Sequence, residues 1–401
     1  MTQFRPFSAI RYAADDRPAD YSSVVAPPYD VLSDADRDAL EALDPRNSVR
    51  LDFPHGATDP EAYDGARRKL DAWLHSGALS ADASPTFTIY RMTAIDDLGQ
   101  ARSTTGVLGS LGLERPGNGD VLPHEETTSK DKADRLNLIR ATRINTSPIW
   151  GLSMASGLGA RCTAIADAAA PDAAAVDGDG VRHEAWIVTD PTDLASLEAI
   201  VSSAPVVIAD GHHRFETALA YQSECAASGS GAGGHDALMA FVVELAEGEL
   251  DVRGIHRIVV LPAAMDPVTW ASTWFEPTRD EPVDPTIRDR MAEAGALALV
   301  TSRGTWLLRP RPGAFDPGLG LDSQRIAAAQ AQTPGATVRY HHDIATVVRA
   351  AQSESDTVGL LLRPATVAQI RSVAEARTRM PAKTTFFWPK PRTGMLFRPV
   401  D

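Results

Sequence analysis

Two spacings of apolar residues occur along this chain and predict a mixture of helices and strands. Apolar residues three and four positions apart predict a helix over 61–77. Runs rich in β-branched and aromatic residues predict strands over 86–91 and 106–113. We therefore expect a mixed α/β (α+β) fold in which helices pack on a sheet.

The sharpest change of pattern lies near the middle of the chain. The apolar run over 205–209 predicts a buried strand, which ends at Asp210 and Gly211. Apolar residues at helical spacing follow from Phe215 onward. The pattern predicts a strand, a tight turn and a helix in direct succession.

The last third of the chain carries hairpin patterns. Strands over 296–301 and 305–309 flank a glycine-containing turn and predict one hairpin. Strands over 385–388 and 395–398 flank a second turn and predict another.

Two small-residue segments interrupt these patterns. The segment over 167–179 is rich in Ala, Asp and Gly and predicts an exposed, poorly packed excursion or a short helix with a loop. The run SGSGAGG over 228–234 predicts a linker, because its match to G-x-G-x-x-G follows a helix and precedes a strand, unlike a dinucleotide-binding fingerprint. We divide the chain into a mixed α/β region over 1–250 and an α/β region over 251–401. In the alternative interpretation, the second region completes the core of the first.

Composition and charge exclude several classes of protein. Of the 401 residues, 43% are hydrophobic and 23% charged, which is typical of a folded chain. The net charge of −14 argues against a protein that coats nucleic acid. No apolar stretch approaches the roughly 18 residues of a membrane helix, and the start lacks the apolar core of a signal peptide. We expect a cytoplasmic protein with small-molecule partners and leave the oligomeric state open.

Three segments concentrate side chains suited to catalysis or binding. The first, over 123–135, contains His124, Glu125, Lys130 and Arg135. A phosphoryl-transfer site needs a carboxylate to accept a hydroxyl proton and cations to offset the charge on phosphate oxygens. The same residues also fit a solvated loop that ends in a helix cap.

The second segment, DGHHR, follows the predicted central strand. Gly211 permits a tight turn, and the first N–H groups of the helix then form an anion site. His212, His213 and Arg214 add hydrogen-bond donors for a phosphate, and Asp210 is a candidate to orient an imidazole or bind a metal ion. The alternative is a helix start with capping and packing roles only.

The third group lies nearer the start of the chain. Tyr29 and Asp30 follow a rigid Pro-Pro turn, and Arg50 ends a polar run. An aromatic ring, an acid and an arginine suit a substrate pocket, and turn chemistry explains them equally well. A further pair, His341 and His342, is typical of a surface helix start, and the alternative is a second histidine pair in a pocket.

Four motifs occur in order along the chain: APPYDV at 26–31, PHEET at 123–127, IADGHHRFETAL at 208–219 and MPAKTTFFWPKPRTGMLF at 380–397. Together they resemble the motifs of a large bacterial and archaeal family known as domain of unknown function 1015. The DGHHR segment is also similar to the phosphate-binding motif of the ParB/sulfiredoxin superfamily, which includes free L-serine kinases. This resemblance implies a ParB/sulfiredoxin-like nucleotide- or phosphate-binding core with large additional α/β segments.

The likeness to the serine kinases implies a phosphotransferase that converts free L-serine to O-phospho-L-serine. By this resemblance Asp210, Gly211, His212, His213 and Arg214 hold the phosphoryl donor, which is pyrophosphate, ATP or ADP. Mg²⁺ is the expected cofactor, with the carboxylate of the DGHHR motif as its ligand.

The same resemblance suggests roles for the other candidates. Glu125 is the general base with His124 beside it, and His213 also takes part in catalysis. Lys130 and Arg135 offset charge on the donor, whereas the group of Tyr29, Asp30 and Arg50 contacts the substrate.

Two other functions stay open at this point. One is a ParB-like nucleotide-binding or regulatory protein without kinase activity, and we find no basic DNA-reading element to support a DNA partner. The other is a redox enzyme related to sulfiredoxin, which needs a reactive cysteine beside the motif. The nearest thiol, Cys225, lies eleven residues past Arg214.

Overall fold

The chain divides into two compact units, which are described separately here. Unit 1 comprises Met1–Asp251, Ala374–Arg377 and Pro389–Asp401, and unit 2 comprises Val252–Val373 and Thr378–Trp388. The two regions expected from the sequence stay a prediction. The structure, a computed structural model, describes residues 2–14, 18–56, 59–96, 99–115, 117, 119–123, 132–263, 265–316, 318–353 and 356–401.

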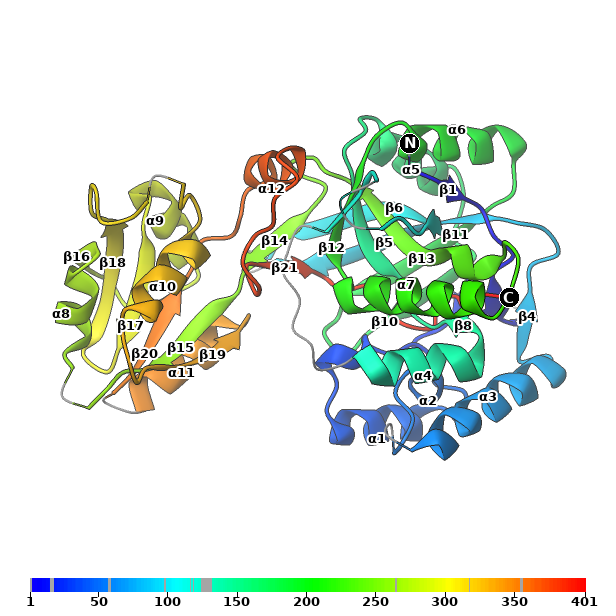
Figure 1. Cartoon of the computed structure of the whole chain (residues 1–401), viewed down its shortest axis with the longest axis horizontal. Coiled ribbons are helices and arrows are strands. Elements are labelled where there is room, and N and C mark those ends of the chain that lie inside the picture. Colours follow the sequence, from blue (N-terminus) through cyan, green and yellow to red (C-terminus); the bar gives the residue numbers. More distant parts are fainter. Residues whose placement is uncertain are drawn as a thin grey trace. The chain divides into compact units, whose positions relative to one another are not determined.

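A mixed sheet forms the centre of unit 1 (Figure 1) and, within the described residues, has ten strands. This confirms the mixed α/β fold, while the ParB/sulfiredoxin-like core stays a prediction. In order across the sheet the strands are β3 (Ala19–Asp20), β10 (Ala173–Val176), β11 (Arg182–Val188), β5 (Phe87–Ile95), β6 (Ala101–Gly112), β13 (Ala237–Glu244), β9 (Ile149–Ser153), β12 (Val206–Asp210) and β7 (Val121–Pro123), with β1 (Phe4–Arg5) paired to β6.

The pairing at one end of the sheet places two strand ends together. Strand β12 runs parallel to β7 and antiparallel to β9. Ile208 of β12 is in register with Pro123 of β7, so both strands leave the sheet at the same edge. Strand β9 enters the sheet at that edge, because Asp210 is in register with Trp150.

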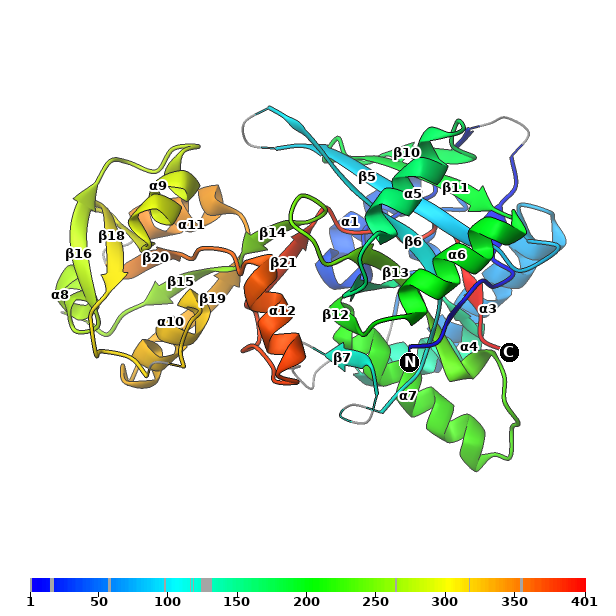
Figure 2. The ribbon, with the colours of Figure 1, turned by 90° about the horizontal axis from the view of Figure 1, so that it is seen from above.

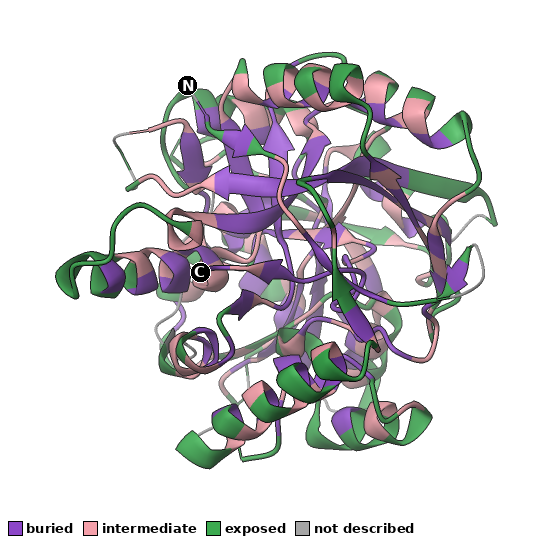
Figure 3. Ribbon diagram, turned by 90° about the vertical axis from the view of Figure 1, so that its right-hand side faces the viewer, coloured by how far each residue is buried: buried purple, intermediate pink, exposed green. Residues whose placement is uncertain are grey.

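Helices cover both faces of this sheet (Figure 1), which explains why its central strands are continuously apolar. Helices α5 and α6 lie on one face, and α7 lies on the other with α4 and α3 beyond it. The buried positions gather in the strands and the inward sides of the helices (Figure 3). The helices of unit 1 are α1 (Asp34–Leu43), α2 (Val49–Asp52), α3 (Pro60–His75), α4 (Lys132–Thr142), α5 (Leu158–Asp167), α6 (Pro191–Ser202) and α7 (His212–Ala227), with the 3₁₀ turns η1 (Tyr29–Val31) and η2 (Gly234–Asp236).

The C-terminal segment Pro389–Asp401 is threaded through unit 1 rather than attached at its surface. Phe397 exchanges backbone hydrogen bonds with Ile10 of β2, and Thr393 does so with Ala26. The last short strand, β22, pairs antiparallel with β8. The short strands outside the main sheet are β2 (Ile10–Tyr12), β4 (Leu79–Ala81), β8 (Ile144–Asn145) and β22 (Arg398–Pro399).

Unit 2 contains an antiparallel sheet that has helices on both faces (Figure 2). Its strands in order are β16 (Phe275–Asp280), β18 (Gly304–Pro310), β17 (Leu297–Thr301), β20 (Thr357–Leu361), β15 (His256–Val260) and β19 (Thr337–His341). The remaining elements are α8 (Pro267–Ser272), α9 (Ile287–Ala294), α10 (Asp322–Ala331), α11 (Ile344–Ser353), α12 (Val367–Glu375), and the ribbon of β14 (Asp251–Gly254) and β21 (Thr385–Trp388).

Alternation along the strands of unit 2 supplies two separate cores. Ile258 and Leu361 pack with α9 and α11, whereas their neighbours Val259 and Leu360 pack with α8 and α10. Successive side chains of a strand point to opposite faces of its sheet, so each strand contributes to both cores.

Two sequence expectations about local structure are wrong. The segment over 167–179 contains β10, which pairs with β3 and β11 inside the main sheet, because alanines at every second position are small enough to be buried there. The predicted hairpin of 385–388 with 395–398 does not form: β21 pairs with β14, and the later residues pair with β2 and β8. The hairpin over 296–309 is confirmed by the pairing of β17 with β18.

Among the described helices, none combines the length and the apolar content needed to cross a membrane.

A buried polar network fastens the C-terminal segment to the sheet. Tyr90 shares its hydroxyl proton with Nδ1 of His183 at 2.7 Å, and Nε2 of His183 lies 2.9 Å from the Asp177 carboxylate. Arg392 donates from Nε to the same carboxylate at 2.9 Å, and its backbone N–H donates to the Tyr90 hydroxyl. Burial opposes ionisation of Asp177, but the bond to His183 and the charge of Arg392 hold its pKa well below the usual range.

We expect the substitution Arg392→Met to reduce the free energy of unfolding by about 3–5 kcal/mol, because Asp177 would keep its charge in a buried place without a cation. Urea unfolding followed by circular dichroism measures this change. The control is Arg102→Met, since the Arg102 side chain is 60% exposed beside Asp96 and should contribute less than about 1 kcal/mol. Equal losses in the two variants would contradict a stabilising role for the buried pair.

Candidate functional site

The central motif folds as the predicted strand, turn and helix. Strand β12 ends at Asp210, and α7 begins at His212 after Gly211. Gly211 has a φ of 87°, and a Cβ there would lie 2.9 Å from Cγ2 of Ile149. Glycine is therefore required by both the backbone conformation and the close approach of β9. The first N–H groups of a 16-residue helix are thus presented at the carboxyl edge of the sheet.

Two cations meet on the carboxylate of Asp210. Arg214, one turn into α7, bonds through Nη2 to Oδ2 at 2.9 Å. Lys390, from the C-terminal segment, bonds through Nζ to Oδ1. The side chains of Arg214 and Lys390 are only 13% and 12% exposed, so both positive charges are held in a largely dry place.

Two residues before β9 also hold the guanidinium of Arg214 in place. Its Nη1 donates to the carbonyl of Pro148 and to the hydroxyl of Ser147 at 3.2 Å. Both residues precede β9, whose start lies at the edge where β12 ends. Arg214 is therefore oriented by two strands as well as by its own helix.

Electrostatics keep Asp210 and Arg214 ionised. Burial alone would raise the pKa of Asp210, but the charges of Lys390 and Arg214 hold that pKa well below its ordinary range. Burial lowers the pKa of Arg214, and the charges of Asp210 and Asp30 more than compensate, so this pKa is raised.

A second arginine lies close to this site. Arg135 of α4 is 6% exposed and donates to Oδ1 of Asp52 at 3.2 Å. Its guanidinium carbon lies 3.9 Å from the ring centroid of Tyr29. Asp52 also accepts hydrogen bonds from Thr146 at 2.6 Å and from Thr393 at 3.3 Å. Asp52 therefore joins α2, α4, the start of β9 and the C-terminal segment.

The tyrosine beside Arg135 stays protonated. Burial raises the pKa of Tyr29 to about 12, while the charges of Arg214 and Arg135 act in the opposite direction. Its hydroxyl is therefore a neutral hydrogen-bond donor at physiological pH.

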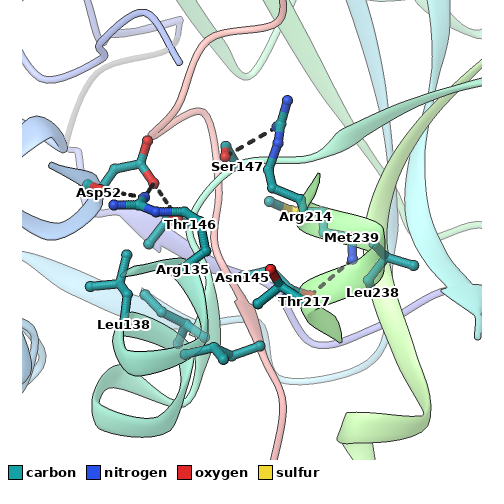
Figure 4. Close-up of a pocket in the computed structure, with 12 residues that line it drawn as sticks. Asp52, Arg135, Leu138, Asn145, Thr146, Ser147, Arg214, Thr217, Leu238 and Met239 are labelled. Carbon is teal, nitrogen blue, oxygen red and sulfur yellow. Dashed lines mark hydrogen bonds and ion pairs between the residues drawn. The ribbon is translucent and has the colours of Figure 1, made fainter. Parts of the chain in front are cut away.

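A cavity of about 50 Å³ separates the two arginines. Arg135 and Arg214 lie on opposite sides of it (Figure 4), with Asn145, Ser147 and Thr217 among its other polar residues. This volume holds only water-sized molecules.

The structure brings together several of the residues expected from the sequence. Arg135 contacts Tyr29, and the charges of Arg214 and Asp30 act on the same ring. Arg50 is instead bound to Glu41, with its Nη1 2.9 Å from Oε2.

Two of the expected histidines lie at the start of α7. His212 and His213 occupy the first turn of α7 and are half-buried. His124, Glu125 and Lys130 lie outside the described residues. The roles suggested for all these residues stay predictions. His341 ends β19 and His342 stacks on Phe386, so neither begins a helix.

Sequence reasoning missed Asp52, Ser147 and Lys390. Lys390 lies in the fourth of the family motifs, within the sequence WPKPRTG. The prolines on both sides of it indicate a fixed backbone. Asp52 and Ser147 carry no such signal, because their importance comes from partners far away in the sequence.

The carboxylate of Asp210, which was expected to bind magnesium, is poorly placed for that role. Both oxygens of Asp210 are engaged by cations, and Mg²⁺ requires carboxylate oxygens for its own coordination. The described residues also contain no group of three or more His, Cys, Asp and Glu placed to hold a metal ion. We therefore derive no catalytic step through a metal bound to Asp210.

We expect Asp210→Asn to lower the free energy of unfolding by roughly 3 kcal/mol. This value is at the lower end of the range for a buried ion pair, because the side chains of Asp210 and Arg214 keep some exposure. The depressed pKa of Asp210 means that its contribution is present above the pKa near 4 of the unfolded chain and is lost as the pH falls through the folded value. Urea unfolding at neutral and acidic pH should therefore show a smaller loss on acidification in the variant.

The matched control for this prediction is Asp71→Asn. Asp71 pairs with Arg67 on α3, and its side chain is 51% exposed, so less than about 1 kcal/mol is expected. A loss for Asp210→Asn no larger than for the control would show that the three charges are not coupled.

Comparisons with known proteins give a family and distant structural likenesses. The family described as "Protein of unknown function (DUF1015)" matches residues 4–323. No curated protein matches the chain.

Three solved structures are distantly similar. A mutant free serine kinase in complex with ADP is 12% identical, with 67% of this chain and 84% of that chain covered and a TM-score of 0.36. SbnI with C-terminal truncation from Staphylococcus aureus is 12% identical, with 71% and 84% covered and a TM-score of 0.39. A conserved hypothetical protein from Pyrococcus furiosus is 14% identical, with 67% and 87% covered and a TM-score of 0.34.

Scores this low carry no argument about activity. The family match, in contrast, covers most of the chain. The protein therefore belongs to the family of unknown function DUF1015.

Proposed function

We propose that the protein is a small-molecule kinase that transfers a phosphoryl group from pyrophosphate or a nucleotide to the hydroxyl of free L-serine. The observation that carries this proposal is the convergence of Arg214 and Lys390 on Asp210 at the start of α7. Helix N–H groups and fixed cations are the groups that bind phosphate oxygens.

The charges of this group are better explained by binding of a phosphoryl donor than by a purely structural ion pair. One carboxylate balances only one of the two cations, so the group of three side chains keeps a net positive charge beside the positive end of the helix dipole. Asp210 acts in this proposal as a positioning residue that holds both cations in place. An arriving phosphate would bind at the start of the helix and attract the positive charges of Lys390 and Arg214.

The expected base belongs to a segment whose two ends lie near this site. Strand β7 ends at Pro123, in register with Ile208 and hence beside the end of β12. The described chain resumes in α4, which carries Arg135. Glu125 lies two residues beyond Pro123, which supports its proposed role as general base.

The proposed chemistry assigns a role to each of these residues. Glu125 takes the proton of the serine hydroxyl as that oxygen attacks the terminal phosphorus. The bond between this phosphorus and its bridging oxygen breaks, and phosphate or the shortened nucleotide leaves with the bonding electrons. His212, His213, Arg214 and Lys390 offset the negative charge that spreads over the transferring group.

Phosphorus NMR of the purified protein with Mg²⁺ and L-serine tests the activity, with pyrophosphate, ATP and ADP in separate tubes. We expect a phosphomonoester signal with one of these donors, and we expect its loss in His213→Ala because a donor to the phosphate is removed. The matched control is His75→Ala, an exposed histidine at the end of α3, which should keep the signal. Donor binding without any phosphomonoester would instead favour a nucleotide-binding or regulatory protein.

The base is tested by Glu125→Gln, with the neighbouring Glu126→Gln as control. We expect kcat to fall by roughly 10²–10⁴-fold in the first variant, with little change in the dissociation constant of the donor. Unchanged turnover in Glu125→Gln would exclude this residue as the base.

The role of Lys390 is tested by its effect on donor binding. We expect Lys390→Met to raise the dissociation constant of the donor by roughly 10–100-fold, since a charge-assisted hydrogen bond contributes about 1.5–3 kcal/mol. Lys390→Arg keeps the charge and should recover part of the affinity, and Lys69→Met on α3 controls for the loss of a lysine elsewhere in unit 1. Equal affinities in Lys390→Met and Lys69→Met would contradict the assignment, provided that circular dichroism shows both variants folded.

A further inference from the structure

Unit 2 contains a large cavity that the proposed kinase site does not use. Its volume is about 820 Å³, and all of its lining residues belong to unit 2. Cavities of roughly 300–1,000 Å³ are typical of sites for small organic ligands. The walls come from β14, the start of β15, α9, the first turn of α10 and the segment between β20 and α12.

The charge of this cavity is opposite to that of the whole chain. Four arginines line it, at positions 253, 288, 325 and 363, against the two carboxylates of Asp289 and Asp322. The chain as a whole carries a net charge of −14, so a positive cavity is a local exception. Such a concentration of one sign attracts ligands of the opposite sign.

One carboxylate is already committed to fixing an arginine. Asp322 is 5% exposed and accepts from Nε of Arg363 at 2.9 Å and from Nη2 at 2.6 Å. The bidentate contact holds the guanidinium of Arg363 in one orientation. Asp289, in contrast, is exposed, and solvent therefore screens its charge.

The lining also includes a neutral hydrogen-bond donor, His256. His256 is 4% exposed, and its Nδ1 accepts the backbone N–H of Leu362 at 3.1 Å. The ring proton is therefore on Nε2, and no other hydrogen bond of His256 is formed within the described residues. Burial and the charges of Arg288 and Arg257 lower the pKa of His256 to about 3, so the ring stays neutral at physiological pH.

Apolar contacts complete the lining. Val252, Met291 and Leu362 lie in the same cavity as the charged groups. Arg253 stacks on the ring of Trp388 with its guanidinium carbon 3.6 Å from the centroid, which reduces its freedom. A ligand with an apolar part as well as anionic groups therefore matches this surface better than an inorganic ion.

We infer that this cavity binds a small organic anion, with carboxylate or phosphate groups on Arg288 and Arg253 and a hydrogen bond from Nε2 of His256. The site is independent of the proposed kinase activity, because it shares no residue with the group around Asp210.

Isothermal titration calorimetry of the full chain tests this inference with two probes, citrate for carboxylates and ADP for phosphates. We expect one of them to bind and its dissociation constant to rise by about tenfold or more in Arg288→Met, which corresponds to about 1.4 kcal/mol. The matched control Arg349→Met removes an exposed arginine of α11 that does not line the cavity. His256→Gln retains a side-chain N–H donor and should bind more tightly than His256→Phe.

Hydrogen exchange with the bound probe locates the site and separates it from unit 1. We expect new protection over 252–256, 320–325 and 362–366, and the protection of these three segments of unit 2 should be the same in Lys390→Met, whose substitution lies in unit 1. Binding of neither probe at millimolar concentration, equal affinity in Arg288→Met and Arg349→Met, or protection confined to unit 1 would each overturn the inference. Circular dichroism of the variants confirms that a loss of affinity is not a loss of folding.

Discussion

A carboxylate that pairs with two largely buried cations sets the arrangement at one edge of the sheet of unit 1. Asp210 stands where β12 leaves the sheet, and it receives Arg214 from the following helix and Lys390 from the end of the chain. Charges in such a place are stable only when paired, so the position of each group depends on the other two. Because Gly211 turns the chain directly after Asp210, the same pairing also places both cations beside the first turn of α7.

This arrangement makes the edge of the sheet depend on the last residues of the chain. Beyond Lys390, Arg392 pairs with the buried Asp177, and Thr393 donates to Asp52. Asp52 in turn binds Arg135, which stacks on Tyr29. One segment thus links the end of β12 to Asp52 and Arg135, and the proposed kinase requires both to be in place together.

The sequence predicted local structure well wherever one segment determines it. The strand, turn and helix around DGHHR are confirmed because a buried apolar run, a glycine and a helical repeat follow each other directly. The expected hairpin at 385–398 failed because the pairing of β21 and β22 is decided by distant strands, β14 and β8. Likewise Asp210 and Arg214 were found as candidates, whereas Lys390 and Asp52 were missed, since their partners lie far away along the chain.

The central claim is that the start of α7 binds a phosphate with help from Lys390, and a crystal structure of the protein soaked with pyrophosphate tests it most directly. The account predicts a phosphate group within hydrogen-bond distance of the backbone N–H groups of His212 and His213 and of Nζ of Lys390. Asp210 should still bind Arg214 in that complex. Pyrophosphate bound elsewhere in unit 1, with Lys390 in contact only with Asp210, would contradict the account.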